Sequence, residues 1–404
     1  MKVFFTKHGD KVLFALALVF LAAALFRSDA NRPHTEAPGI VFTQWWENDL
    51  DKDILPALAE EFKALHGINV TINLASYEDV LETLRFSPEK LPQGGRVAGD
   101  VYAIDPLWLP ELTGLGIIED DFTLFSFIDV LYYNVEILKD AGFSRPPKNR
   151  SEFLDYARAI ASMRGNRPRS GLGYVLGISL GENNSRGVYD DVFPWIWAAG
   201  VPLVRDGSPV VNSRQVIESL SFLAVLNSEG LIAPDAFRAD NERKLGHFTS
   251  GEVAFMVAPT VYVKRVRELM GDEAFGITSI PAPDNYYGRP FLATAGWAFG
   301  IHSASERKEE ARLFTDFLAG KASAFSEQMG AVPGSGAPPA RDPFYSKVWD
   351  IAISSDSARD FAGLSWTEMG AVFREEIASL LADNTTPAAA AAKIQERIGI
   401  LLKD

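Results

Sequence analysis

Cysteine is absent from the 404-residue chain, and histidine is scarce, with five residues. The lack of cysteine excludes a disulfide framework, a thiolate zinc site, an iron–sulfur cluster, a cysteine nucleophile and a lipid attached to an N-terminal cysteine. The histidines are scattered and show no His-x-x-x-H spacing, which argues against zinc. We therefore expect no metal and no cofactor.

Positive charge is also in short supply. Lysine and arginine number 39 against 53 acidic residues, which gives a formal net charge of −14. Such a surface repels a phosphate backbone, so we expect no nucleic-acid partner. No P-loop and no dinucleotide-binding glycine pattern is present. The apolar share of 47% is that of an ordinary globular protein, and the length suggests two or three domains of ~150 residues each.

A long apolar run occurs near the N-terminus, over residues 12–26. Three lysines precede it, and the small residues Ser28 and Ala30 follow it. This order is typical of an export signal cleaved before Asn31, and the run is shorter than the ~20 residues of a membrane-spanning helix. We interpret residues 1–30 as a signal peptide or, if uncleaved, an N-terminal anchor. Either reading predicts a periplasmic or otherwise extracytoplasmic protein.

The segment that follows has the pattern of an α/β protein. Residues 31–39 are polar, contain two prolines and indicate a linker. A strand over 40–42, a helix over Ile54–His66 and a strand over 68–74 form the parallel unit of a doubly wound sheet. A third strand is expected over 100–104.

The same alternation continues to the C-terminus. Asn149 and Thr386 are candidate helix caps, and residues 202–209 suggest a hairpin. Further helices are expected over 108–115, 153–163, 195–199, 213–229, 307–318 and 387–402, and further strands over 174–180, 275–280 and 297–301.

Five segments in order carry a family resemblance. They are residues 41–67, with a tryptophan-bearing loop before LPALAEEFKALHG; 100–118, DVYAIDPLWLPELTGLGII; 131–160, beginning LYYNVEILKDAGF; 248–256, FTSGEVAFM; and 276–301 with 311–318, which contain TAGWAFGI and ARLFTDFL. Together they resemble the extracellular solute-binding proteins of ABC importers, in particular the maltose-binding-protein-like carbohydrate group. The stretch over 119–130 is shorter than is usual in that group.

The resemblance implies a two-lobed periplasmic-binding-protein fold of type II, in which each lobe is a doubly wound sheet with flanking helices. The N-lobe would comprise residues 40–127 and 291–335, and the C-lobe 128–290 and 336–404, joined by hinge crossovers. The implied function is a monomeric receptor, not an enzyme. It would capture a small ligand, a sugar or oligosaccharide, between the lobes and deliver it to the membrane permease of an ABC importer.

A sugar site needs aromatic platforms and a few fixed polar groups, and open α/β sheets bind ligands at the carboxyl ends of their strands. Trp45 and Trp46 follow the first expected strand, Tyr77 and Glu78 follow the second, and Asp105 follows the third. We predict that these five residues contact the ligand.

Five more candidates lie later in the chain. Glu182 belongs to a polar loop, GENNSRGVYDDVFP, and Trp195 follows this loop. Gly296 and Trp297 stand where the family usually has a glycine pair at the second crossover, and Trp366 is expected in a loop that faces the cleft.

Two alternatives stay open on the sequence. Residues 177–181 match the G-x-S-x-G of a hydrolase elbow, and Glu182, Asp190 and Asp191 are nearby carboxylates, so an exported glycan-acting enzyme is one. However, a polar loop rather than a helix follows the motif. Tyrosine pairs at 132–133 and 286–287, with the negative charge, make a ferric ion or a polyamine the other class of ligand.

Overall fold

The computed structural model describes residues 39–46, 50, 52–85, 99–163, 172–205, 208–292, 294–322, 331–333, 342–357 and 366–402. Residues 1–30 and most of the linker lie outside this part of the chain, so the export signal and the anchor stay predictions. Among the described residues, no helix has the length and apolar character needed to cross a bilayer.

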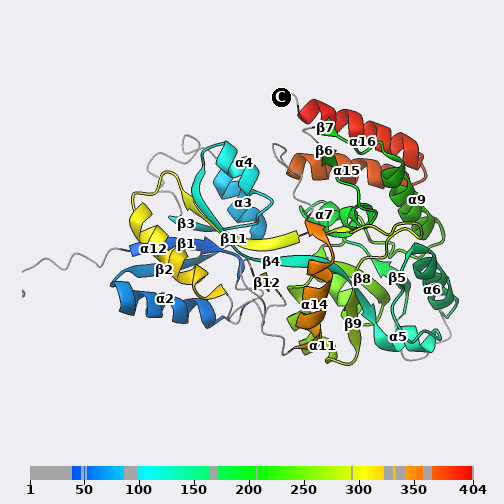
Figure 1. Cartoon of the computed structure of the whole chain (residues 1–404), viewed down its shortest axis with the longest axis horizontal. Helices are drawn as coiled ribbons and strands as arrows, with labels where there is room; N and C mark the ends of the chain where they lie inside the picture. Colours follow the sequence, from blue (N-terminus) through cyan, green and yellow to red (C-terminus); the bar gives the residue numbers. More distant parts are fainter. Residues whose placement is uncertain are drawn as a thin grey trace, which may run out of the picture.

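Helices and strands alternate along the described residues (Figure 1). The strands are β1 Gly39–Gln44, β2 Asn69–Leu74, β3 Val101–Ile104, β4 Ile118–Asn134, β5 Tyr174–Gly177, β6 Val204–Arg205, β7 Ser208–Pro209, β8 Val253–Pro259, β9 Phe275–Thr278, β10 Phe291–Leu292, β11 Thr294–His302, β12 Val332–Pro333 and β13 Asp356–Ser357.

The helices cover this framework of strands. They are α2 Ile54–His66, α3 Tyr77–Arg85, α4 Leu109–Gly114, α5 Val135–Asp140, α6 Arg150–Ser162, α7 Gly187–Asp191, α8 Phe193–Trp197, α9 Arg214–Ser228, α10 Asn241–Thr249, α11 Tyr262–Met270, α12 Lys308–Ala319, α14 Pro343–Ile353, α15 Trp366–Leu381 and α16 Pro387–Leu401.

Most of the predicted elements are confirmed, with shifted ends. The helix α2 has the bounds that the sequence predicts, and Asn149 caps α6 by accepting a 2.9 Å hydrogen bond from the backbone N–H of Glu152. Two predictions need correction. The strand expected over 174–180 ends at Gly177, and the helix expected over 195–199 is α8, which begins at Phe193 because Pro194 fits its first turn.

The long strand β4 joins the two halves of the molecule, and no strand was expected over its whole range. A nine-stranded sheet has the order β2-β1-β3-β11-β4-β8-β5, with β9 and β12 also paired to β4. The first part of β4 pairs with β11 as far as Ile128, and the next residue, Asp129, begins the pairing with β8. One continuous strand therefore passes from one half of the sheet to the other.

The buried side chains form separate cores on either side of this crossover point. One core draws its residues from 40–127 and 297–331, and Phe62 of α2 packs against Phe314 of α12 within it, with ring centroids 5.2 Å apart. We call this part the N-lobe. In Figure 1 its helices α2 and α12 lie on one side of the strands and α3 and α4 on the other.

Described residues from 128–292 and 342–402 build the C-lobe. Strand residues alternate between its two cores: Leu131 faces the core that contains α6, α9, α15 and α16, whereas Tyr132 faces the core that contains α10, α11 and α14. The lobe boundaries given by the resemblance stay predictions.

Candidate functional site

A cavity of about 210 Å³ lies where the two lobes meet. From the N-lobe it is lined by Trp45, Tyr77, Glu78, Asp105, Phe127, Gly296 and Trp297. From the C-lobe range it is lined by Asn184, Arg186, Asp190, Asn241, Glu242, Pro259, Val261 and Tyr262. We call this cavity the cleft.

The N-lobe side of the cleft is a set of rings that support one another, and we call Trp45, Tyr77, Phe127 and Trp297 the aromatic wall. The edge of Trp45 meets Tyr77 at 5.1 Å between ring centroids. Trp297 stacks on the buried indole of Trp46 at 4.6 Å, with the ring planes 8° apart. These contacts fix the orientation of the rings that face the cleft.

Asp105 is a buried carboxylate at the end of β3. Its Oδ1 accepts a 3.0 Å hydrogen bond from the backbone N–H of Leu107, and its Oδ2 accepts a 2.9 Å bond from the Tyr77 hydroxyl. Burial raises the pKa of Asp105, whereas the positive charge of Arg186 opposes this rise. Burial and the Asp105 charge also raise the pKa of Tyr77 well above its usual range, so the phenol stays protonated as the donor.

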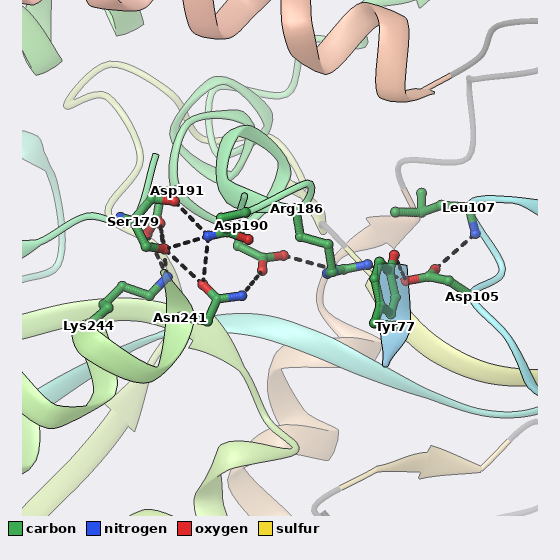
Figure 2. Close-up of polar contacts among 10 residues, drawn as sticks. Tyr77, Asp105, Leu107, Ser179, Arg186, Asp190, Asp191, Asn241 and Lys244 are labelled. Atoms are coloured by element: carbon green, nitrogen blue, oxygen red, sulfur yellow. Dashed lines mark hydrogen bonds and ion pairs between the residues drawn. The ribbon is translucent and has the colours of Figure 1, made fainter. Parts of the chain in front are cut away.

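The C-lobe side is polar, and we call Asn184, Arg186, Asp190, Asn241 and Glu242 the polar wall. The Arg186 guanidinium donates to Asp105 across the cleft and, at 2.9 Å, to Oδ1 of Asp190 (Figure 2). Asn241 donates to the other oxygen of Asp190 at 3.2 Å. Burial alone would lower the pKa of Arg186, but Asp190 and Asp105 raise it well above its ordinary value.

A buried ion pair supports the polar wall from behind. Lys244 of α10 places its Nζ 2.9 Å from both oxygens of Asp191, and each side chain is only 1% exposed. Burial raises the pKa of Asp191, whereas the Lys244 charge opposes it. Ser179 donates to the same carboxylate from its hydroxyl at 2.6 Å and from its N–H at 2.8 Å.

These contacts give the serine of the G-x-S-x-G match a structural role. The Ser179 hydroxyl lies between Asp191 and Asn241, and Asn184 donates to it at 3.1 Å. In the part of the chain that the structure describes, no histidine contacts this serine. The motif ends a strand and anchors the loop after it. The described residues also contain no group of three or more His, Asp or Glu placed to hold a metal ion.

Asp129 is a buried carboxyl at the crossover point in β4. It is 1% exposed, and neither of its oxygens has a hydrogen-bond partner among the described residues. Burial, followed by the charge of Asp190, raises its pKa well above the usual range. Its environment therefore favours the neutral form of the Asp129 carboxyl over the charged form.

Six of the ten predicted ligand residues line the cleft: Trp45, Tyr77, Glu78, Asp105, Gly296 and Trp297. Their role in binding stays a prediction, but the fold brings them together.

The other four lie elsewhere. Trp46 is buried behind Trp297. Trp195 lies in the C-lobe core, 5.3 Å from Phe153 between ring centroids. Glu182 is exposed, and its carbonyl accepts a 3.0 Å bond from Arg374. The loop predicted at Trp366 is wrong, because α15 begins at this residue; its side chain lies outside the described residues.

The sequence prediction missed most of the polar wall. Arg186 and Asn184 lie in the polar loop that the sequence singles out, but Asn241 and Glu242 come from α10, more than fifty positions later. The sequence indicates Asp190 only as a candidate catalytic carboxylate. The polar loop was the only local signal, because a residue type alone does not reveal which side chains meet across a cleft.

Solved structures share this architecture. The GacH receptor of Streptomyces glaucescens, known unliganded and in complex with acarbose, is similar at a TM-score of 0.75 and 18% identity over 91% of this chain and 100% of that chain. Maltose-bound MalE3 of T. maritima is similar at a TM-score of 0.71 and 19% identity, over 90% of this chain and 100% of that chain. These likenesses show the fold, the two-lobed periplasmic-binding-protein fold of type II.

Curated relatives align with a smaller share of this chain. A Deinococcus radiodurans protein named "Probable ABC transporter-binding protein" is 25% identical over 283 residues, 65% of this chain and 64% of the relative. A binding protein of Brucella abortus is 23% identical over 209 residues, 50% of this chain and 47% of the relative. The chain thus spans between about half and two thirds of the length of these relatives. The family model of the bacterial extracellular solute-binding proteins matches residues 48–325, more than half of the chain, and the chain therefore belongs to this family.

Proposed function

We propose that this protein is an extracytoplasmic receptor that captures a sugar or an oligosaccharide in the cleft and delivers it to the permease of an ABC importer. The observation that carries the proposal is the pairing of an aromatic wall with a polar wall across one cavity. Sugars present flat C–H faces to aromatic rings and a rim of hydroxyls to polar groups. Trp45 and Trp297 would stack on the ligand, and Glu78 and Asp105 would accept hydrogen bonds from its hydroxyl groups.

The hydrogen-bond inventory of the cleft supports a ligand rich in donors. Arg186 already donates to two carboxylates, Asn184 donates to Ser179 at 2.7 Å, and Asn241 donates to Asp190. An ionised carboxylate can accept hydrogen bonds but cannot donate them. Four of them line the cleft: Glu78, Asp105, Asp190 and Glu242. Arg186 pairs with Asp105 and Asp190, and Arg265 pairs with Glu242, yet the carboxylates outnumber these cations. A polyol can donate to the acceptor positions that remain, whereas a phosphorylated or carboxylated solute would meet repulsion.

Relatives of the same fold point in the same direction. The GacH receptor was solved with acarbose, a solute-binding protein of Thermotoga lettingae with α-D-tagatose, and MalE3 with maltose. The Thermotoga lettingae protein is similar at a TM-score of 0.73 and 17% identity over 90% of this chain and 100% of that chain. The importer is proposed from the name of the Deinococcus radiodurans relative.

We further propose that the receptor acts as a monomer, carries out no catalysis and works in the periplasm or elsewhere outside the cytoplasm. The buried hydrogen bonds of Ser179 support the absence of a hydrolase nucleophile. The charged start and the apolar run over 12–26 support export.

A thermal-shift screen tests the proposal. The purified protein is mixed with mono-, di- and oligosaccharides, polyols, polyamines and ferric citrate. A ligand at ~100 times its dissociation constant adds about 2.7 kcal/mol to the free energy of unfolding, which gives a visible rise in melting temperature. We expect a rise with one sugar class that Trp297→Ala abolishes. A rise only with polyamines or ferric citrate would contradict the sugar assignment and keep the receptor.

A further inference from the structure

The charged groups of the cleft do not balance. Its lining contains four carboxylates, those of Glu78, Asp105, Asp190 and Glu242. Among the described residues that line it, Arg186 is the only cation. From outside the lining, Arg265 donates to both oxygens of Glu242, at 2.6 and 2.5 Å. With both arginines counted, the cleft keeps a formal surplus of negative charge.

Most of this negative charge is withheld from water. The side chain of Asp190 is fully buried, and that of Asp105 is 3% exposed. Asp129 adds a buried carboxyl with no hydrogen-bond partner among the described residues, and burial, followed by the charge of Asp190, raises its pKa. A buried carboxylate is costly unless a cation pairs with it, and its attraction for a cation is stronger than at the surface. The cleft therefore favours a solute that brings positive charge.

The carboxylates also have free acceptor positions. An ionised carboxylate offers about four lone-pair sites. Asp190 accepts from Arg186 at 2.9 Å and from Asn241 at 3.2 Å. Glu78 accepts from the hydroxyl of Ser185 at 3.2 Å, and no described cation pairs with it. An ammonium group carries three donors and no acceptor, so it matches what these carboxylates lack.

The aromatic wall suits the same kind of solute. Trp45 and Trp297 line the cavity that Asp190 lines from the other lobe. The face of an indole attracts a cation and also packs on the C–H face of a sugar ring. A sugar ring that carries an ammonium group can therefore use both walls at once.

We propose that the solute is an amino sugar, a sugar whose ring carries a protonated amine, and that Asp190 and Glu78 are the residues that select the amine. The charged nitrogen donates to these carboxylates, and the C–H face of the ring packs on Trp45 or Trp297. This inference rests on the proposed function, since it names one class of sugar within it.

Sugars that differ at one substituent test the proposal. D-glucosamine, N-acetyl-D-glucosamine and D-glucose share a ring and carry a charged amine, a neutral amide and a neutral hydroxyl at the same position. The galactose series gives the same comparison on a second ring, and the chitosan disaccharide, chitobiose and cellobiose give it on a disaccharide. Isothermal titration calorimetry in slightly acidic buffer measures each affinity. In at least one series we expect the amine to bind about tenfold more tightly than both neutral partners, and added sodium chloride to reduce this preference.

Two variants assign the selection to residues. Glu78→Gln, at an exposed position, should reduce the preference for the amine several-fold, and Asp190→Asn should reduce it further because Asp190 is buried. Circular dichroism checks that each variant is folded, and Glu78→Gln decides if Asp190→Asn does not fold. Glu82→Gln is the matched control, because it removes the same charge from an exposed position one turn later on α3, outside the cleft lining. It should keep the preference of the parent.

Neutral partners that bind as tightly as the amine in every series overturn the proposal and leave the sugar receptor standing. Absence of binding by every amine overturns it as well, and so does a preference that Glu78→Gln lowers no more than Glu82→Gln does. Tighter binding of spermidine than of every amino sugar contradicts both this proposal and the sugar assignment. The proposed function fails on a separate result, a thermal-shift screen in which no sugar class raises the melting temperature.

Discussion

The aromatic wall and the polar wall face the same cavity, but the chain builds them in different ways. Trp45 follows β1, Tyr77 opens α3 after β2, and Trp297 lies within β11, so each ring is placed by the strand nearest to it. The polar wall instead joins the loop over 181–187 and α7 to α10, and its Asp190–Asn241 contact spans 51 positions.

The difference has an energetic side. Rings packed on rings need complementary shape and apolar surroundings, but they need no partner of opposite charge. Buried charges need a partner at a fixed place, since a charge left without one costs several kcal/mol. The aromatic wall should therefore tolerate substitution better in folding, and the polar wall should be sensitive to the loss of a single partner.

The largest expected effect comes from the pair behind the polar wall. Lys244→Met leaves the Asp191 carboxylate buried without its cation, and we expect a loss of about 3–5 kcal/mol in the free energy of unfolding. Urea denaturation measures it. Lys63→Met, at an exposed position of α2, is the control and should change little. A loss for Lys244→Met as small as that of the control would show that burial of the pair does not matter.

The next effect concerns Asp129 and depends on pH. Its pKa is raised in the folded protein, so the unfolded chain ionises first and the folded state loses stability as pH rises above the unfolded value of ~3.9. The facing groups are Asp190, Arg186, Lys244 and Asp191. Asp129→Asn removes this loss. The melting temperature of the variant minus that of the wild type should therefore increase as pH rises.

The control for this pH series is Asp155→Asn, at an exposed position of α6. It makes the same substitution away from the crossover, so a gain seen only in Asp129→Asn is due to the buried carboxyl. If Asp129→Asn behaves in the same way as Asp155→Asn from pH 4 to pH 8, the carboxyl at the crossover is not held in its protonated form.

A smaller effect is expected for tryptophans of the aromatic wall and of the core, which should differ in whether affinity or stability is lost. With a solute found by the thermal-shift screen, Trp45→Phe should weaken binding by on the order of tenfold, since it reduces the ring that faces the cleft. Trp195→Phe should lower the melting temperature and leave affinity unchanged, because Trp195 lies in the C-lobe core. Isothermal titration calorimetry measures the affinity of the two variants, and a thermal melt measures their melting temperatures. Equal losses of affinity would mean that the two tryptophans are not distinguished by their place in the fold.

The smallest effect should come from the rim of the polar wall. Glu242 lies on the same helix as Lys244, but its side chain is 60% exposed and pairs with Arg265 at the surface. Glu242→Gln should change the free energy of unfolding by less than about 1 kcal/mol in urea denaturation. A loss comparable to that of Lys244→Met would contradict the view that burial, rather than charge, sets the sensitivity of this wall.

Much of the fold followed from local patterns. The apolar spacing of α2 and the glycine after it predicted both ends of that helix, and Gly67 indeed adopts a left-handed φ of 69°. Thr386 caps α16 as predicted, accepting from Ala389 at 3.2 Å. The strand β4 escaped prediction, because its pairing with β11, β8 and β9 involves partners far away in the sequence.

The sequence by itself determined the class of the protein: the order of strands and helices, the aromatic residues at strand ends, and the five segments that resemble a solute-binding family. These depend on spacing, capping and residue type, which are local properties. Only the tertiary structure decided that Trp195 belongs to a core, that Trp297 stacks on Trp46, and that Arg186 meets Asp105 across the cleft. Such contacts join residues up to about 250 positions apart, and their partners are set by how the lobes pack rather than by any pattern in the chain.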